Sequence, residues 1–270
     1  MWVLQGFFKG ELAERSNAAV LKTVSPQGLE GSNPSLSATS PYVVYARPVR
    51  TVVLAAVLVV AAPGLRAACD DVPAAKVDWS GCTKQGLMLR KLALPGARFD
   101  RSTLVGVNFE GSDLRHATFT YAELSRSSFR DAVMDGANLQ KIVAVRSNFG
   151  RAQLARADLE KAELHRCVLS NAVLWRANLS KGDFGRSTFD RADLRDANLA
   201  HSSFSRASFR EARLAGADFS QAFLFGARFE ATDLAAVKGL VQAQIDVACG
   251  DAKTKLPAAL AAPASWPCME

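Results

Sequence analysis

A leucine or phenylalanine recurs at every fifth position from Leu89 to Leu234, and this period constrains the fold more than any other feature of the chain. The column has thirty positions, of which twenty-eight are Leu or Phe, and the exceptions are Met134 and Ala144. A period of five matches neither the 3.6-residue α-helix nor the two-residue alternation of a strand. A helix would spread these side chains around its whole surface, so no single face could be buried. The pattern therefore favours a stack of short repeats.

A second column of mostly small residues lies two positions before this large column, as at Ala157 and Ala177. The residue between the two columns is often Asp or Asn, as at Asp158 and Asn178. If the chain turns one corner in each repeat, both columns point inward and the other three positions face solvent. Successive coils then stack about 4.8 Å apart through strand-like backbone hydrogen bonds.

Repeats such as Ala157-Asp158-Leu159-Glu160-Lys161 resemble the A-(D/N)-L-x-x unit of the bacterial pentapeptide-repeat family. The resemblance implies an all-β fold, a right-handed quadrilateral β-helix with four repeats per coil. We expect this domain to occupy residues 87–236. Thirty repeats would make about seven coils and a rod of roughly 35 Å at strand spacing.

The N-terminal part of the chain does not share the repeat. Residues 1–45 contain runs such as Val20-Leu21-Lys22-Thr23 and Gly31-Ser32-Asn33-Pro34, which resemble a translated serine transfer-RNA gene. This indicates a misplaced start, with a disordered leader as the alternative. Residues 46–68 combine a basic stretch, an apolar run and a small-residue exit, which is the layout of a secretory signal peptide. We expect export to the periplasm; cleavage, an uncleaved anchor and lipidation at Cys69 all stay open.

The two ends of the rod need caps, because an open end exposes apolar interior and unpaired strand edges. We expect residues 69–86 to form the N-terminal cap, with Trp79 as its lid. Residues 237–270 should form the C-terminal cap, as a short helix over residues 240–249 followed by an extended tail.

Four of the five cysteines flank the rod in two pairs. In an oxidising compartment we expect bridges Cys69–Cys82 and Cys249–Cys268, although four cysteines permit three pairings and the sequence alone does not choose. Cys167 occupies a small-column position, so we expect it to be a buried free thiol.

Positive charge is concentrated in the middle of the repeats. From Cys69 onward, 27 Lys and Arg against 23 Asp and Glu leave a net charge of +4. Between residues 141 and 191, every basic residue follows the large column by two positions. This basic belt consists of Lys141, Arg146, Arg151, Arg156, Lys161, Arg166, Arg176, Lys181, Arg186 and Arg191. The belt is either an ordinary solvated surface with weak ion pairs or a site for an anionic envelope component. Nucleic acid is not expected, because Trp175 alone offers a stacking surface there.

A few outward positions are apolar, and exposed apolar patches often mark contacts. Val173 and Trp175 have no obvious cover, so they are candidates for contact with an unknown partner protein. Phe223 and Phe225 lie near the C-terminal end. We expect the C-terminal helix or tail to cover them, with a homodimer contact as the alternative.

The sequence predicts no catalytic, cofactor or metal site. His116, His165 and His201 lie in separate coils with no second histidine or cysteine nearby, and no phosphate-binding glycine loop occurs. We therefore expect an exported, non-catalytic structural or binding module. The alternative resembles the topoisomerase-protecting members of the family, which mimic duplex DNA. Such mimicry requires strong negative charge, which this rod lacks.

Overall fold

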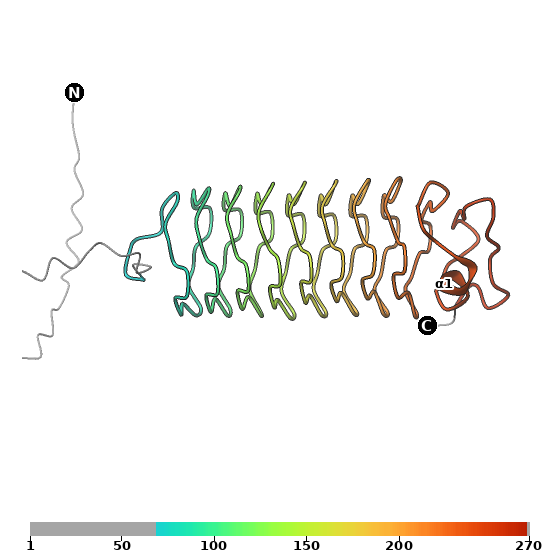
Figure 1. Ribbon diagram of the computed structural model, residues 1–270, viewed down its shortest axis with the longest axis horizontal. Coiled ribbons are helices and arrows are strands. Elements are labelled where there is room, and N and C mark those ends of the chain that lie inside the picture. The colour runs from blue at the N-terminus through green and yellow to red at the C-terminus, as the bar shows by residue number, and fades with distance from the viewer. Residues whose placement is uncertain (1–68, 269–270) are drawn as a thin grey trace, which may run out of the picture. The chain divides into compact units, whose positions relative to one another are not determined.

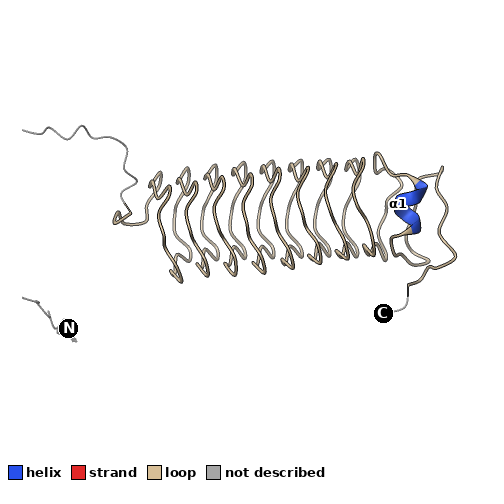
Figure 2. Cartoon of the chain, turned by 60° about the horizontal axis from the view of Figure 1, so that its bottom comes forward, coloured by secondary structure: helices blue, strands red, loops and turns tan. Residues whose placement is uncertain are grey.

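The computed structural model describes residues 69–268, which form a right-handed quadrilateral β-helix (Figure 1). Parallel bridges from Asp78↔Arg98 to Asp218↔Lys238 each join residues twenty positions apart. One coil is therefore four five-residue repeats, as predicted. Each repeat contributes one bridge residue between two turns, so the coils are drawn as loops without strand arrows (Figure 2).

The large column fills the interior of the rod. Its members from Leu94 to Leu234 are at most 1% exposed. Phenylalanine rings twenty residues apart stack on one another: Phe109 and Phe129 have ring centroids 5.0 Å apart, and Phe129 and Phe149 4.8 Å apart. Burial of each such side chain contributes roughly 1.5–3 kcal/mol before ordering entropy is counted. The coils therefore stabilise one another along a single axis.

The gap that Ala144 leaves in the large column is compensated within the same repeat. Ile142, at a small-column position, is fully buried, and so is Ala144. The repeat thus exchanges its large and small positions and still places one large side chain inside the coil.

The position two residues after the large column forms the corner of each repeat. All members of the basic belt have φ between 56° and 60° there. Residues other than glycine seldom adopt this left-handed conformation, and glycine takes the same position at Gly106 and Gly136. The corner conformation turns the chain and directs the long basic side chains away from the rod.

The β-helix begins earlier than predicted. Regular bridges start at Asp78, inside the segment expected to be only a cap, and Trp79 occupies a large-column position. Trp79 is 2% exposed, its ring packs edge-on against Phe99 with centroids 5.9 Å apart, and its Nε1–H donates to the Asp71 carbonyl over 3.2 Å. Trp79 is therefore the predicted lid, supplied by the first coil itself.

The C-terminal cap contains α1 (Gln242–Asp246), which is shorter than the helix expected over residues 240–249. Ile245 is fully buried, and the Gln244 side-chain amide donates to the carbonyls of Phe219 and Ala222 over 2.9 and 2.8 Å. α1 thus closes the interior and satisfies carbonyl groups at the end of the rod. Pairing then resumes with a shifted register, as in Arg228↔Cys249.

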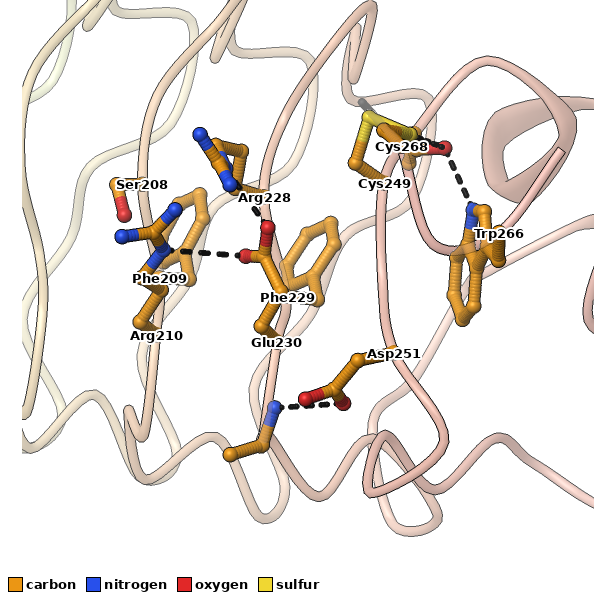
Figure 3. A network of polar contacts seen from close by, with 12 residues as sticks. Ser208, Phe209, Arg210, Arg228, Phe229, Glu230, Cys249, Asp251, Trp266 and Cys268 are labelled. Atoms are coloured by element: carbon orange, nitrogen blue, oxygen red, sulfur yellow. Dashed lines mark hydrogen bonds and ion pairs between the residues drawn. A yellow bond between two sulfur atoms is a disulfide. The ribbon is translucent and has the colours of Figure 1, made fainter. Parts of the chain in front are cut away.

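Both predicted disulfides are present. Cys69–Cys82 and Cys249–Cys268 each have a Cα–Cα distance of 5.6 Å. At the C-terminal end the Trp266 indole donates to the Ala248 carbonyl over 2.7 Å, next to the disulfide (Figure 3). Each end of the rod is therefore fastened by a disulfide and by a hydrogen-bonded tryptophan.

The expected transfer-RNA-like leader and signal peptide lie outside the described residues. Within residues 69–268, no helix is both long enough and apolar enough to span a membrane.

Candidate functional site

The basic belt divides into four separate columns. Because one coil contains twenty residues, belt residues twenty apart lie above one another at the same corner. The four columns are Lys141, Lys161 and Lys181; Arg146, Arg166 and Arg186; Arg151 and Arg191, with Asn171 between them; and Arg156 and Arg176. The four corners can therefore be compared one by one.

Each of three corners contains at least one basic residue that is paired with a carboxylate of the chain. The Arg151 guanidinium donates two hydrogen bonds to the Asp131 carboxylate, each of 2.6 Å, and this pairing holds the pKa of Asp131 below its usual value. At the lysine corner, Lys181 lies 3.0 Å from Glu160 and lowers the pKa of that carboxyl. Exposed pairs of this kind add little stability, but they neutralise charge locally.

The indole ring of Trp175 contacts two basic side chains of the belt. The guanidinium groups of Arg156 and Arg176 lie 5.0 and 4.4 Å from its ring centre, at cation–π distance. Arg176 also lies 3.9 Å from Asp196. Trp175 is half-buried, and the neighbouring Val173 is 37% exposed. Two stacked arginines therefore cover part of the surface that the sequence offered as a partner contact.

The remaining corner differs from the other three. Arginines follow one another there in five successive coils, and all five side chains are exposed. This arginine corner consists of Arg126, Arg146, Arg166, Arg186 and Arg206. Among residues 69–268, no carboxylate lies within 4.0 Å of any of these five guanidinium groups.

Backbone hydrogen bonds hold the arginine corner in line. Each arginine amide donates to the carbonyl of the residue nineteen positions later, with N···O distances of 2.8–3.0 Å. Examples are Arg146 to His165 and Arg166 to Gly185. Neighbouring arginines therefore repeat along the axis at strand spacing, about 4.8 Å.

A column of hydroxyl groups stiffens this corner from inside. The side chains of Ser127 and Ser147 donate to carbonyl groups of the preceding coil, Leu104 and Leu124, over 2.7 and 2.8 Å. Cys167 continues the column as the predicted buried thiol, with its Sγ 2.6 Å from the Ala144 carbonyl oxygen. Burial raises the pKa of the thiol to about 12, so it stays protonated and unreactive.

Two shallow hollows follow the arginine corner along the rod. The first, of about 510 Å³, is bordered by Arg126, Arg146 and Arg166, and the second, of about 260 Å³, by Arg186 and Arg206. His165 lines both hollows. The other polar side chains that line them are Glu123, Ser125, Asp183, Ser203 and Ser205. The corner is therefore the basic wall of a shallow groove.

The expectation that the C-terminal cap covers Phe223 and Phe225 is wrong. Phe223 is 56% and Phe225 is 47% exposed, and their rings lie against each other with centroids 6.3 Å apart. The cause is the short α1, which directs Gln244 and Ile245 into the end of the rod. Phe225 instead lines the C-terminal end of the groove.

Many arginines elsewhere in the rod are paired with carboxylates, in contrast to the five of the arginine corner. Near the C-terminal end, Arg228 and Arg210 lie 2.7 and 3.4 Å from the two carboxylate oxygens of Glu230 (Figure 3). Within residues 69–268, no three His, Cys, Asp or Glu side chains gather in a group that could hold a metal ion.

The sequence interpretation missed Arg126 and Arg206, which extend the arginine corner beyond the belt at both ends. They lie outside the 141–191 window in which the basic residues share one repeat position. Reading every twentieth residue, rather than every fifth, would have found both.

Two family models match the repeats. The model described as pentapeptide repeats (8 copies) matches residues 89–120 and 112–142, and the model described as pentapeptide repeat region matches residues 162–238. Among curated proteins, none matches this sequence.

Solved structures with the same type of repeat are also similar to the chain. A trypsin-treated variant of QnrB1, a plasmid-mediated fluoroquinolone resistance protein, is 17% identical over 66% of this chain and 85% of its own, with a TM-score of 0.57. HetL, from the cyanobacterium Nostoc sp. strain PCC 7120, is 22% identical over 64% of this chain and 84% of its own, with a TM-score of 0.32. The first of these likenesses supports the fold and nothing further.

Proposed function

This chain belongs to the pentapeptide-repeat family, and from that premise we propose that it is an exported, non-catalytic scaffold that binds an anionic partner on its outer surface. The observation that carries the proposal is the arginine corner. Five exposed arginines in one line, without a carboxylate partner among residues 69–268, create a positive field along one side of the rod. Since the interior is filled with side chains, binding is left to the outward positions.

Export is supported by the two ends of the rod. Disulfides form and persist in oxidising compartments such as the periplasm, and both pairs of flanking cysteines are bonded. The proposal expects native protein in the periplasmic fraction, with its N-terminus near Cys69. Fractionation followed by N-terminal sequencing tests this. Recovery in the cytoplasm with residues 1–68 attached would contradict it.

Binding is tested with purified protein and a panel of polyanions. The panel consists of lipopolysaccharide, vesicles containing phosphatidylglycerol, and a linear acidic polysaccharide. The proposal expects at least one of them to bind, with affinity that falls steeply as salt is raised to about 0.15 M, because exposed charges are then screened over about 8 Å. A protein that binds none of the three at low salt would not be a scaffold for an anionic partner.

A second candidate is a topoisomerase-interacting protein that mimics DNA, and the fold likeness to QnrB1 favours it. The charge opposes it, because residues from Cys69 onward carry +4 and the arginine corner is positive along its whole length. We expect no effect of the protein on DNA gyrase supercoiling, with or without a fluoroquinolone. Protection of gyrase from the drug would support the second candidate over the first.

A further inference from the structure

We propose that the arginine corner is a binding track for a linear acidic polysaccharide, a chain of uronic acid units that lies parallel to the rod axis. The proposal rests on the proposed function, since it requires an anionic partner, and it names the chemical class of that partner. It also assigns binding to one corner and its groove, rather than to the basic belt as a whole.

The first argument is the spacing of the charges. Backbone hydrogen bonds between coils hold successive arginines of the arginine corner about 4.8 Å apart along the rod axis. One uronic acid unit carries one carboxylate and is about as long as this spacing. In a two-fold ribbon of such units the carboxylates alternate between the two sides of the chain. Same-side carboxylates then recur at about twice the arginine spacing, so the chain can meet alternate arginines of the corner. An extended acidic peptide repeats its same-side carboxylates at about 6.6–6.8 Å, and the phosphates of one strand of duplex DNA rise by about 3.4 Å each along the helix axis.

The second argument is the chemistry of the arginine side chains. A guanidinium group binds a carboxylate through two parallel hydrogen bonds, a geometry that Arg151 and Asp131 already show at another corner. At the arginine corner no carboxylate of residues 69–268 fills this role. The five guanidinium groups of the arginine corner can therefore bind an external ligand that carries several carboxylates.

The third argument is the width of the positive surface. The outward positions beside the arginine corner include Glu123, Glu163 and Asp183, which lie in the column that pairs through bridges such as Glu163↔Asp183. A flat lipid surface resting on this side would meet these carboxylates as well as the arginines. A narrow chain along the corner meets the arginines, while its hydroxyl groups can donate to the neighbouring carboxylates. The charge pattern therefore favours a chain over a membrane.

The groove supplies further contacts that suit a sugar. Ser125 and Ser205 line it with hydroxyl groups that can hydrogen bond to sugar hydroxyls, next to the contact of 3.1 Å between His165 Nε2 and the Asp183 carboxylate. At its C-terminal end, the exposed ring of Phe225 offers an apolar surface to the C–H face of a sugar ring. A polymer in the groove would thus contact charged, polar and aromatic groups in sequence along the axis.

The test measures binding of a fluorescently labelled oligogalacturonate long enough to span the corner, by anisotropy at low salt. The ladder variant is Arg146→Gln/Arg166→Gln/Arg186→Gln. The control variant, Arg115→Gln/Arg195→Gln/Arg213→Gln, removes the same charge from arginines that are paired with Asp113 or Asp193. Glutamine suits the corner conformation, because Gln221 already adopts it with φ of 56°. A neutral malto-oligosaccharide serves as the ligand control.

We expect the ladder variant to bind the oligogalacturonate about tenfold or more weakly than the natural protein, because the three central guanidinium groups of the track, and the charge-assisted hydrogen bonds that they donate, are lost. The control variant should stay within about threefold, since its charges lie away from the track and are screened. The single variant Arg166→Gln should show a smaller loss in the same direction, and it keeps the test valid if the triple variant fails to fold.

Three results would overturn the inference. Equal losses in the ladder and control variants would show that net charge alone governs binding. If the malto-oligosaccharide bound as tightly as the oligogalacturonate, the protein would not be recognising the carboxylates. Binding to lipopolysaccharide or anionic vesicles without binding to the oligogalacturonate would refute the polysaccharide but leave the proposed scaffold function standing, whereas binding to none of the three would remove both.

Discussion

Replacing Cys167 by serine should stabilise the protein, although it makes a buried residue more polar. Cys167 interrupts a column in which Ser127, Ser147 and Ser187 place hydroxyl groups between coils. Its amide donates to the Ser187 hydroxyl over 2.8 Å, while its own sulfur faces the Ala144 carbonyl. A hydroxyl is a stronger donor than a thiol, so the serine completes the column.

The magnitude follows from one exchanged hydrogen bond. A typical intramolecular hydrogen bond adds about 0.5–1.5 kcal/mol, so we expect Cys167→Ser to raise the free energy of unfolding by up to about 1 kcal/mol after the loss of apolar sulfur. Cys167→Ala removes the group altogether and should lower the free energy of unfolding by about 1–2 kcal/mol. The two variants are therefore expected to differ in sign.

Urea unfolding followed by tryptophan fluorescence, with both disulfides intact, measures the two variants. A parallel assay with a thiol reagent at pH 8 should find Cys167 unmodified in the folded natural protein, because its pKa is raised to about 12. The reasoning fails if serine destabilises the protein as much as alanine does, since the hydroxyl column would then have no energetic role at this position.

Two further predictions concern the core and the charged surface. Phe129→Ala should lower the free energy of unfolding by about 3–5 kcal/mol in the same urea assay, because Phe129 is fully buried between two stacked rings; a loss below about 1 kcal/mol would contradict the packing. Arg151 lowers the pKa of Asp131 in the folded protein. Their pair therefore stabilises the fold at pH values above the unfolded pKa of the carboxyl, near 3.8. This stabilisation is lost as the pH falls through the lower pKa of the folded state. Asp131→Asn should therefore flatten the acid side of the stability profile in thermal unfolding, and an unchanged profile would argue against the pair.

The period of five was enough to predict a stack of short turning repeats, and the resemblance to the pentapeptide-repeat family supplied the right-handed, four-sided coil. The large column from Leu89 to Leu234 is compatible only with a chain that turns at each repeat, and the structure places that column inside the rod. The start of the rod could not be predicted from this column, because Lys84 stands at a large-column position in the first coil. Its ammonium group lies 5.0 Å from the Trp79 ring centre instead of inside the rod.

The candidate site was only partly visible in the sequence. The basic belt was evident because its members share a repeat position, but partner carboxylates are often a whole coil away, as Asp131 is from Arg151. Only the stacked coils show which arginines are paired and which are not. The exposure of Phe223 and Phe225 could not be predicted from the sequence either, because it depends on where α1 directs its side chains.

The measurement that tests the central claim most directly moves one arginine from the arginine corner to the next corner of the same coil. Combining Arg166→Gln with Asn171→Arg keeps the number of arginines and the net charge, and residues 166 and 171 both occupy corner positions, with φ of 56° and 59°. If stacking at one corner creates the binding track, the oligogalacturonate should bind this variant as weakly as it binds Arg166→Gln alone. If the natural affinity is retained, the charge of the rod, and not the line of arginines, is what the partner recognises.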